Sequence, residues 1–226
     1  MVDANTAFAN SQNTTSLGNV TVMRIVGFPL PNGFPNDSRN DAQASPVIAA
    51  LRNAVRADVV SVVTENFATL GACGVAFVQR PGCTFPPTAG CDVGAQFNAF
   101  AYNIVAQDCA IATDAFAHEF GHNLGGEHDP AHAPAPAQAS FVHSFGHFVS
   151  GAFETVMSVS RPAGIPQILH FSKPNVFFGP NPTGIANQRH NAMTIETLYP
   201  VFRQFRDGPV FADGFESPDA CPTITF

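Results

Sequence analysis

The sequence predicts an α+β domain, in which helices and strands follow one another in the first half and irregular chain fills much of the second half. Two observations carry this prediction. Apolar, β-branched runs flank a segment whose apolar residues recur three and four positions apart, which predicts a strand, a helix and a second strand. Further on, residues 126–184 show neither period and are rich in Pro and Gly before a final helical pattern begins.

The elements expected before residue 110 are separated by loops dense in Pro, Gly and Asn. Ser45 is a candidate N-cap with Pro46 at the first helical position, which fixes the start of the second helix. That helix lies between two apolar strands and so predicts a β-α-β unit. In chain order we expect a weak helix at 4–12, a strand at 20–26, a loop at 28–37, a helix at 45–55, and strands at 58–64, 74–79 and 100–106.

The rest of the chain is expected to hold two helices and a tail. Residues 113–124 predict a helix that Gly125 ends, because Gly tolerates the left-handed conformation at a helix terminus. A last helix is expected within 186–205, despite Pro200. From residue 207 the chain is acidic and without periodicity, so we expect one domain over 1–206 and an acidic C-terminal tail over 207–226.

The composition excludes two classes of function. Charged residues make up 12% of the 226 residues, about half of the roughly 25% found in an average protein, and the net charge is -7. Lys173 is the one lysine, and no basic patch is available to neutralise phosphates, so nucleic acid is not an expected partner. No run approaches the ~20 apolar residues that cross a bilayer, so no membrane span is expected.

Five cysteines lack the C-x-x-C spacing of structural zinc or redox motifs and therefore predict disulfides; they are Cys73, Cys83, Cys91, Cys109 and Cys221. The first four lie close together, where one or two bridges would fix loops in an oxidising compartment. The alternative is free or buried thiols in a reducing cytosol. The first residues lack the basic and apolar regions of a secretory signal, so export has to be inferred from other features.

One segment, HEFGHNLGGEHD, has the spacing of a metal site and begins at His118. His118 and His122 are four positions apart, so they lie on one face of a helix and can bind one ion. A turn at Gly125 lets His128 return as a third ligand, while Glu119 lies where a base could contact a metal-bound water. Three histidines with an open fourth position are typical of a catalytic rather than a structural zinc site.

The segment resembles the metzincin signature H-E-x-x-H-x-x-G-x-x-H, and the Asp129 that follows is similar to the reprolysin (adamalysin) type. Residues 155–158 (TVMS) resemble the metzincin Met-turn, which implies that Met157 forms an apolar floor beneath the three histidines. Where other metzincins read M-x-Y this chain has Val159, so no tyrosine ligand is expected and the reprolysin branch is favoured.

The resemblance to bacterial reprolysin-like peptidases extends over nearly the whole chain. Residues 171–174 (FSKP) with Gly179 are similar to the F-S-N-P segment after the Met-turn, from which Lys173 departs. Residues 56–60 and 73–76 resemble the strand, turn and edge strand of the same group. The family implies a metzincin-type zincin fold, with a twisted mixed sheet of about four to five strands, an active-site helix and a largely irregular C-terminal subdomain that ends in a helix.

The resemblance also implies the function of a zinc-dependent endopeptidase, which hydrolyses peptide bonds of protein substrates with a metal-activated water and Glu119 as general base. The implied cofactor is Zn2+, the implied catalytic domain is 1–206, and its active-site cleft lies between 1–125 and 126–206. The edge strand implied to pair with an extended peptide substrate comprises Gly74, Val75, Ala76 and Phe77. We expect a secreted monomer.

Smaller expectations concern the surroundings of the site. Asp129 is expected to orient a ligand or to make a local structural hydrogen bond, and Glu127 and Arg161 are expected to face solvent. The remaining histidines are expected in surface or loop roles: His132, His143, His147, His170 and His190. The family begins with an apolar strand that the residues before 4–12 do not supply, so we expect an N-terminus that is truncated relative to the family.

Two alternatives to the peptidase remain open at this point. The first is a catalytically inactive metzincin-fold module that binds peptides or acts as an adhesin. The second is a structural zinc protein. The intact Glu119 disfavours the first alternative, because a pure binder needs no base, and the three-histidine site disfavours the second.

Overall fold

The computed structural model describes residues 2–13, 24–26, 35–64, 72–80, 97–160, 164–206 and 223–225. Within them the helices are α1 (Val2–Asn10), α2 (Pro35–Ala44), α3 (Pro46–Ala54), α5 (Gln107–Ala112), α6 (Ala115–Asn123) and α7 (Asn191–Phe202). The strands are β1 (Arg24–Val26), β2 (Val60–Thr64), β3 (Gly74–Ala76), β4 (Tyr102–Ala106), β5 (Phe148–Val149), β6 (Phe153–Thr155), β7 (Gln167–Ile168), β8 (Phe177–Phe178), β9 (Asn181–Pro182) and β10 (Thr223–Thr225). The chain is therefore of the predicted α+β class.

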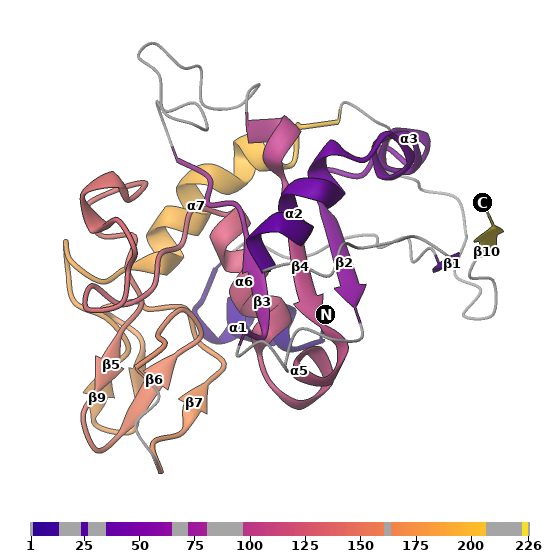
Figure 1. The fold of residues 1–226 in the computed structure, drawn as a ribbon. Helices are drawn as coiled ribbons and strands as arrows, with labels where there is room; N and C mark the ends of the chain where they lie inside the picture. Colours follow the sequence, from indigo (N-terminus) through magenta and orange to yellow (C-terminus); the bar gives the residue numbers. More distant parts are fainter. Residues whose placement is uncertain are drawn as a thin grey trace.

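The central sheet has the strand order β2-β4-β3, with β2 parallel and β3 antiparallel to β4. Every residue of β4 is buried, as expected for a middle strand covered on both faces. Helices α2 and α6 each pack against β3 and β4 (Figure 1). Strand β3 is an edge strand, as the sequence predicts, although it ends at Ala76 rather than at Gln79.

The prediction of a four- to five-stranded sheet is wrong for the described residues, because the central sheet has three strands. The predicted first strand exists as β1, but it pairs in parallel with β10, near the C-terminus, and not with β2 (Figure 1). The predicted β-α-β unit is therefore not formed. A pairing between two segments so far apart in the chain leaves no local periodicity from which it could be predicted.

Helix α2 occupies chain that the sequence assigns in part to a loop. Pro35 starts it, at a position where the missing backbone N–H of proline is not needed. The helix has no apolar stripe, and it reaches the core through the fully buried Ser38 and Ala42, which are four positions apart. The next helix, α3, begins as predicted: Ser45 accepts a hydrogen bond from the backbone N–H of Ile48 at 3.3 Å.

Aromatic side chains form much of the core between α1, α6 and the second half of the chain. The ring of Phe8 stacks on Phe171 with centroids 5.1 Å apart and meets the edge of Phe120 at 6.4 Å. Phe120 in turn contacts Phe202 of α7 at 5.6 Å. The helix with the predicted ligands is thus packed between the helices α1 and α7.

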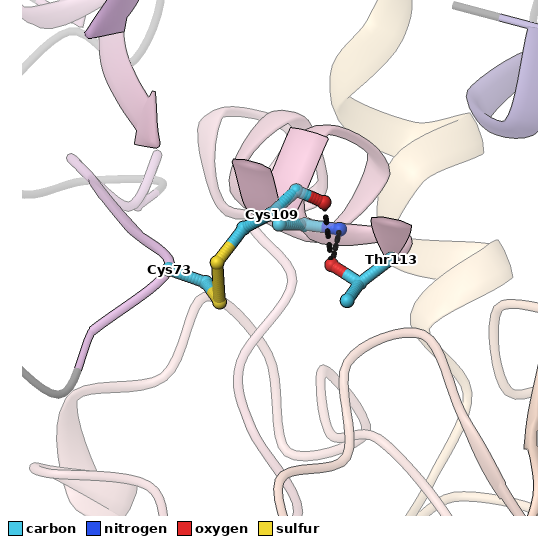
Figure 2. The surroundings of a disulfide bond; sticks show 4 residues. Cys73, Cys109 and Thr113 are labelled. Carbon is cyan, nitrogen blue, oxygen red and sulfur yellow. Dashed lines mark hydrogen bonds between the residues drawn. A yellow bond between two sulfur atoms is a disulfide. The ribbon is translucent and has the colours of Figure 1, made fainter. Parts of the chain in front are cut away.

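A disulfide between Cys73 and Cys109 joins the start of β3 to α5 (Figure 2). This confirms one predicted bridge; the other cysteines lie outside the described residues. The hydroxyl of Thr113 donates to the carbonyl of Cys109 at 2.8 Å and accepts from the backbone N–H of Ala115 at 3.1 Å. The bridge and this hydroxyl together fix the edge strand relative to the first turn of α6.

Residues after α6 are largely irregular, as predicted, with short strands that the sequence does not predict, and they end in α7 with Pro200 inside it. A buried polar cluster holds the start of α7: the Ser172 hydroxyl donates to Phe145 O at 2.7 Å and accepts from Asn191 N at 2.8 Å. The side chain of Asn191 also donates to Ser144 O at 2.5 Å. None of the helices in the described ranges is long and apolar enough to cross a membrane.

Candidate metal centre

The three predicted ligands converge. The Nε2 atom of His128 lies 3.0 Å from Nε2 of His118 and 3.1 Å from Nε2 of His122, and the candidate ligand atoms of all three lie within 4.8 Å of one another. In a tetrahedral site with Zn–N bonds of about 2.0–2.1 Å, ligand nitrogens are about 3.3 Å apart. The nitrogen spacing therefore fits one small divalent cation.

The second nitrogen of two of these rings is held by a backbone carbonyl. Nδ1 of His118 donates to Val156 O at 2.7 Å, and Nδ1 of His122 donates to Gly126 O at 2.7 Å. A carbonyl oxygen only accepts, so it fixes the tautomer that leaves the Nε2 lone pair for a metal. Burial, followed by the charges of the neighbouring histidines, lowers the pKa of His122 well below its ordinary value, which keeps the ring in its neutral, ligating form.

Gly125 ends α6 and sends the chain back toward the histidines, as the sequence predicts. Its φ is +83°, a left-handed conformation that glycine adopts without strain. A Cβ there would also collide with Leu198 and lie 3.0 Å from Gln79 O. The reversal places His128 opposite the other two imidazoles.

Met157 is fully buried beneath α6. A Cβ on Gly121 would lie 2.5 Å from its sulfur and 2.9 Å from the ring of Phe171, so the helix needs glycine at this point. The preceding residue, Val156, supplies the carbonyl that orients His118. The segment 155–158 therefore both supports the helix from below and aligns one ligand.

Glu119 is buried next to the edge strand. A Cβ on Gly74 would lie 2.6 Å from Glu119 Cγ, so the first residue of β3 makes room for this carboxyl. Oε2 of Glu119 has no hydrogen-bond partner among the described residues. Burial raises the pKa of Glu119 to about 8, while the charge of Arg39 lowers it and that of Asp114 adds to the rise. A bound divalent cation would shift the pKa back down.

Asp129 joins the loop of the third histidine to the residues that follow Met157. Its Oδ2 accepts hydrogen bonds from the Ser158 hydroxyl and from the backbone N–H of Val159, both at 3.2 Å, and its Oδ1 accepts from His132 at 2.8 Å. Burial acts to raise the pKa of Asp129, but the hydrogen bonds from His132, Val159 and Ser158 outweigh it and leave the pKa below its ordinary value.

Asn123, the last residue of α6, is a feature that the sequence reasoning missed. Its fully buried amide donates to Phe77 O at 2.9 Å and to Tyr102 O at 3.1 Å, and its Oδ1 accepts from Asn103 at 2.7 Å. One side chain thus binds the ligand helix to both β3 and β4. In the sequence, this role is indicated by the position of Asn123 directly after His122.

One smaller expectation is wrong. Glu127 is 1% exposed and forms an ion pair with Arg80 at 2.8 Å, because the returning chain passes beneath the end of the edge strand. His147 lies in a loop, as expected, but is only 6% exposed, and its ring nitrogen lies 3.1 Å from the Arg189 guanidinium. Burial, and next the charge of Arg189, lowers the pKa of His147 to about 4. Arg161 lies outside the described residues.

Comparison with known proteins agrees with this geometry. Residues 3–129, which end at the aspartate after the third histidine, match the model of metallo-peptidase family M12B, reprolysin-like. A peptidyl-Asp metalloendopeptidase of Xanthomonas campestris is 29% identical over 108 residues, which are 48% of this chain and 25% of the relative. One of Stenotrophomonas maltophilia is 30% identical over 108 residues, 47% of this chain and 26% of the relative.

The chain thus spans about a quarter of the length of these curated relatives. A solved structure described as that of a chaperone-substrate complex superimposes with a TM-score of 0.63 over 92% of this chain and 30% of its own. At 17% identity that likeness concerns the fold alone. The family match covers more than half of the chain and all three converging histidines, and the chain therefore belongs to the reprolysin-like metallo-peptidase family M12B.

Proposed function

We propose that this chain is a zinc-dependent endopeptidase, with His118, His122 and His128 as the metal ligands and Glu119 as the general base. The observation that carries the proposal is the convergence of three Nε2 atoms, two of them in rings oriented by carbonyls, beside a buried carboxyl with an unpartnered oxygen. Nitrogen ligands at this spacing suit Zn2+ better than Mg2+ or Ca2+, which prefer oxygen ligands.

When bound, zinc would lower the pKa of a coordinated water toward ~7 and polarise the carbonyl of a peptide bond. Glu119 would accept a proton from the attacking water at Oε2, the oxygen without a partner, and deliver it to the nitrogen of the leaving amine. Met157 and Asp129 are proposed to act through the ligands. Met157 would support α6, and Asp129 would hold the His128 loop against the segment after Met157.

The substrate is proposed to be an extended peptide that pairs with the outer side of β3, in a cleft between 1–125 and 126–206. The curated relatives are named peptidyl-Asp metalloendopeptidases, and we propose that this chain also prefers peptides that contain Asp. The disulfide fits an oxidising, extracellular location, and a monomer is the simplest assembly that leaves the edge of β3 open.

Cleavage of casein by the purified chain tests this function. The account predicts cleavage that stops with phenanthroline and returns when Zn2+ is added back. Cleavage that persists unchanged after the chelator has removed all bound metal would refute the proposed chemistry. An inactive peptide-binding module would bind zinc and leave casein intact; the buried Glu119, with an oxygen that has no partner among the described residues, argues against that alternative.

A further inference from the structure

The edge of β3 with which no described strand pairs carries a guanidinium group. Arg39 extends from α2, with its guanidinium carbon 3.8 Å from the centre of the Phe77 ring and Nη1 donating to Ala76 O at 2.9 Å. Cys73 and Phe77 make the backbone hydrogen bonds to β4, so by strand alternation the carbonyl of Ala76 points away from β4. Arg39 therefore lies on the side of β3 that a peptide strand would approach.

The two faces of β3 place this guanidinium near the proposed base. The missing side chain of Gly74 makes room for Glu119 of α6, whereas Phe77, of opposite parity in the strand, faces Arg39 of α2. Helices α6 and α2 thus cover opposite faces, and Arg39 reaches the edge between them. The charges of Arg39 and Glu119 influence each other.

Arg39 forms no ion pair with any carboxylate among the described residues. Its hydrogen bonds go to Ala76 O and, at 3.3 Å, to Asn40 Oδ1, and its Nε is buried without a partner. Burial lowers the pKa of the guanidinium more than the charge of Glu119 raises it, which reflects the cost of a partly buried cation with no carboxylate in contact.

The other cationic side chains that the structure describes are either bound elsewhere or exposed. Arg80 and Lys173 face carboxylates, Arg189 faces a histidine, Arg52 and Arg206 bind the loop around Asn98, and Arg56 and Arg203 are exposed. Arg39 therefore differs from the other cationic side chains that the structure describes. It is partly buried, it lies at the outer edge of β3, and it forms no ion pair with a described carboxylate.

We propose that Arg39 determines substrate preference by binding the carboxylate of an aspartate in the peptide that pairs along β3. This inference rests on the proposed peptidase function. A guanidinium matches a carboxylate with two parallel N–H donors, and an ammonium or a neutral side chain does not. When the carboxylate takes up these donors, Ala76 O becomes available to a backbone N–H of the peptide, so recognition of the side chain and strand pairing support each other.

Two quenched fluorescent peptides, identical except for Asp or Asn at one position, test the inference on the zinc-loaded chain. A hydrogen bond between two charged groups is strong enough that the wild-type kcat/KM should be about 10- to 100-fold higher for the Asp peptide than for the Asn peptide. Arg39→Gln should lower kcat/KM for the Asp peptide by that factor relative to the Asn peptide, so that the ratio approaches one; the loss of the Arg39 charge near Glu119 affects both peptides alike. The exposed Arg203→Gln, which makes the same change of charge, should keep the wild-type ratio.

Arg39→Glu separates recognition from a structural role, because it should make a Lys peptide the better substrate, whereas simple loss of structure would lower all rates together. The inference would be overturned if Arg39→Gln kept the wild-type Asp:Asn ratio of kcat/KM. It would also be overturned if Arg161→Gln lost this ratio while Arg39→Gln kept it. Equal cleavage of both peptides by the wild type would also overturn the inference about Arg39, but it would not contradict the proposed peptidase function. Failure to cleave either peptide or casein would instead refute the peptidase itself.

Discussion

Replacement of Gly121 by alanine should destabilise the protein through collisions with two identifiable side chains. The new Cβ would lie 2.5 Å from the Met157 sulfur and 2.9 Å from the Phe171 ring, in a region where both side chains are fully buried. Forcing an extra methyl group into a packed core costs about 1–3 kcal/mol. Alanine is better than glycine inside a helix by about 1 kcal/mol, so the net loss in the free energy of unfolding should be about 0–2 kcal/mol.

A double-mutant cycle isolates the collision from the helix preference. Met157→Ala alone should cost about 2–5 kcal/mol because it leaves a cavity. In that background the collision with the sulfur is gone and the cavity leaves room for the Phe171 ring to shift away from the new methyl group, so the second change should be neutral or stabilising by up to about 1 kcal/mol. The coupling energy between the two sites should therefore be about 1–3 kcal/mol.

Urea unfolding of the four proteins at fixed zinc concentration measures this coupling, and zinc affinity measured on the same samples shows whether Met157 supports the ligands. Additive effects of the two substitutions would show that Gly121 does not make room for Met157. The assignment of the segment 155–158 as the support beneath the histidines would then lose its physical basis.

Three further predictions follow from other contacts. Asn123→Ala should lower the free energy of unfolding by about 2–4 kcal/mol in urea denaturation and reduce kcat/KM, because the buried Phe77 carbonyl and Asn103 amide lose their hydrogen bonds to Asn123 and the Tyr102 carbonyl keeps only that from the Phe77 N–H; an unchanged stability would contradict this. Cys73→Ser with Cys109→Ser should cost about 3–4 kcal/mol, since the bridge closes a loop with a sequence separation of 36, and wild type under reducing conditions should match the variant. His147 has a folded pKa of about 4 against 6.5 ordinarily, so its unfolded form binds more protons and stability is lost as pH falls between these values. Between pH 7 and pH 4 the free energy of unfolding should therefore fall by about 2–3 kcal/mol less in His147→Gln than in the wild type. The same fall in both proteins would refute the assignment.

The sequence predicted those parts of the fold that local periodicity or local chemistry encodes. Helix α6 follows from the histidine spacing, and the turn at Gly125 follows from the need for a left-handed residue. Helix α2 was missed because it meets the sheet through Ser38 and Ala42, which are too small to form a visible apolar stripe. The β1–β10 pair was missed because it joins segments from opposite ends of the chain.

The site shows the same division. The convergence of the three histidines could be predicted because a metal site imposes a fixed spacing on side chains along one helix and its turn. The carbonyl of Val156 that orients His118 could not be predicted, since any residue supplies a carbonyl. The requirement for Gly121 and the position of Arg39 both depend on which segments meet in space. Contacts between distant segments are the part that the sequence pattern does not show.

The most direct test of the central claim is to measure bound zinc and peptide hydrolysis on the same samples of wild type and Glu119→Gln. The account predicts one zinc per chain in both proteins, because the ligands are the three histidines, and a loss of kcat by at least about 100-fold in the variant, because the base is gone. A variant that binds zinc and keeps near wild-type turnover would contradict the claim that Glu119 is the general base. A wild-type chain that binds no zinc would contradict the metal centre itself.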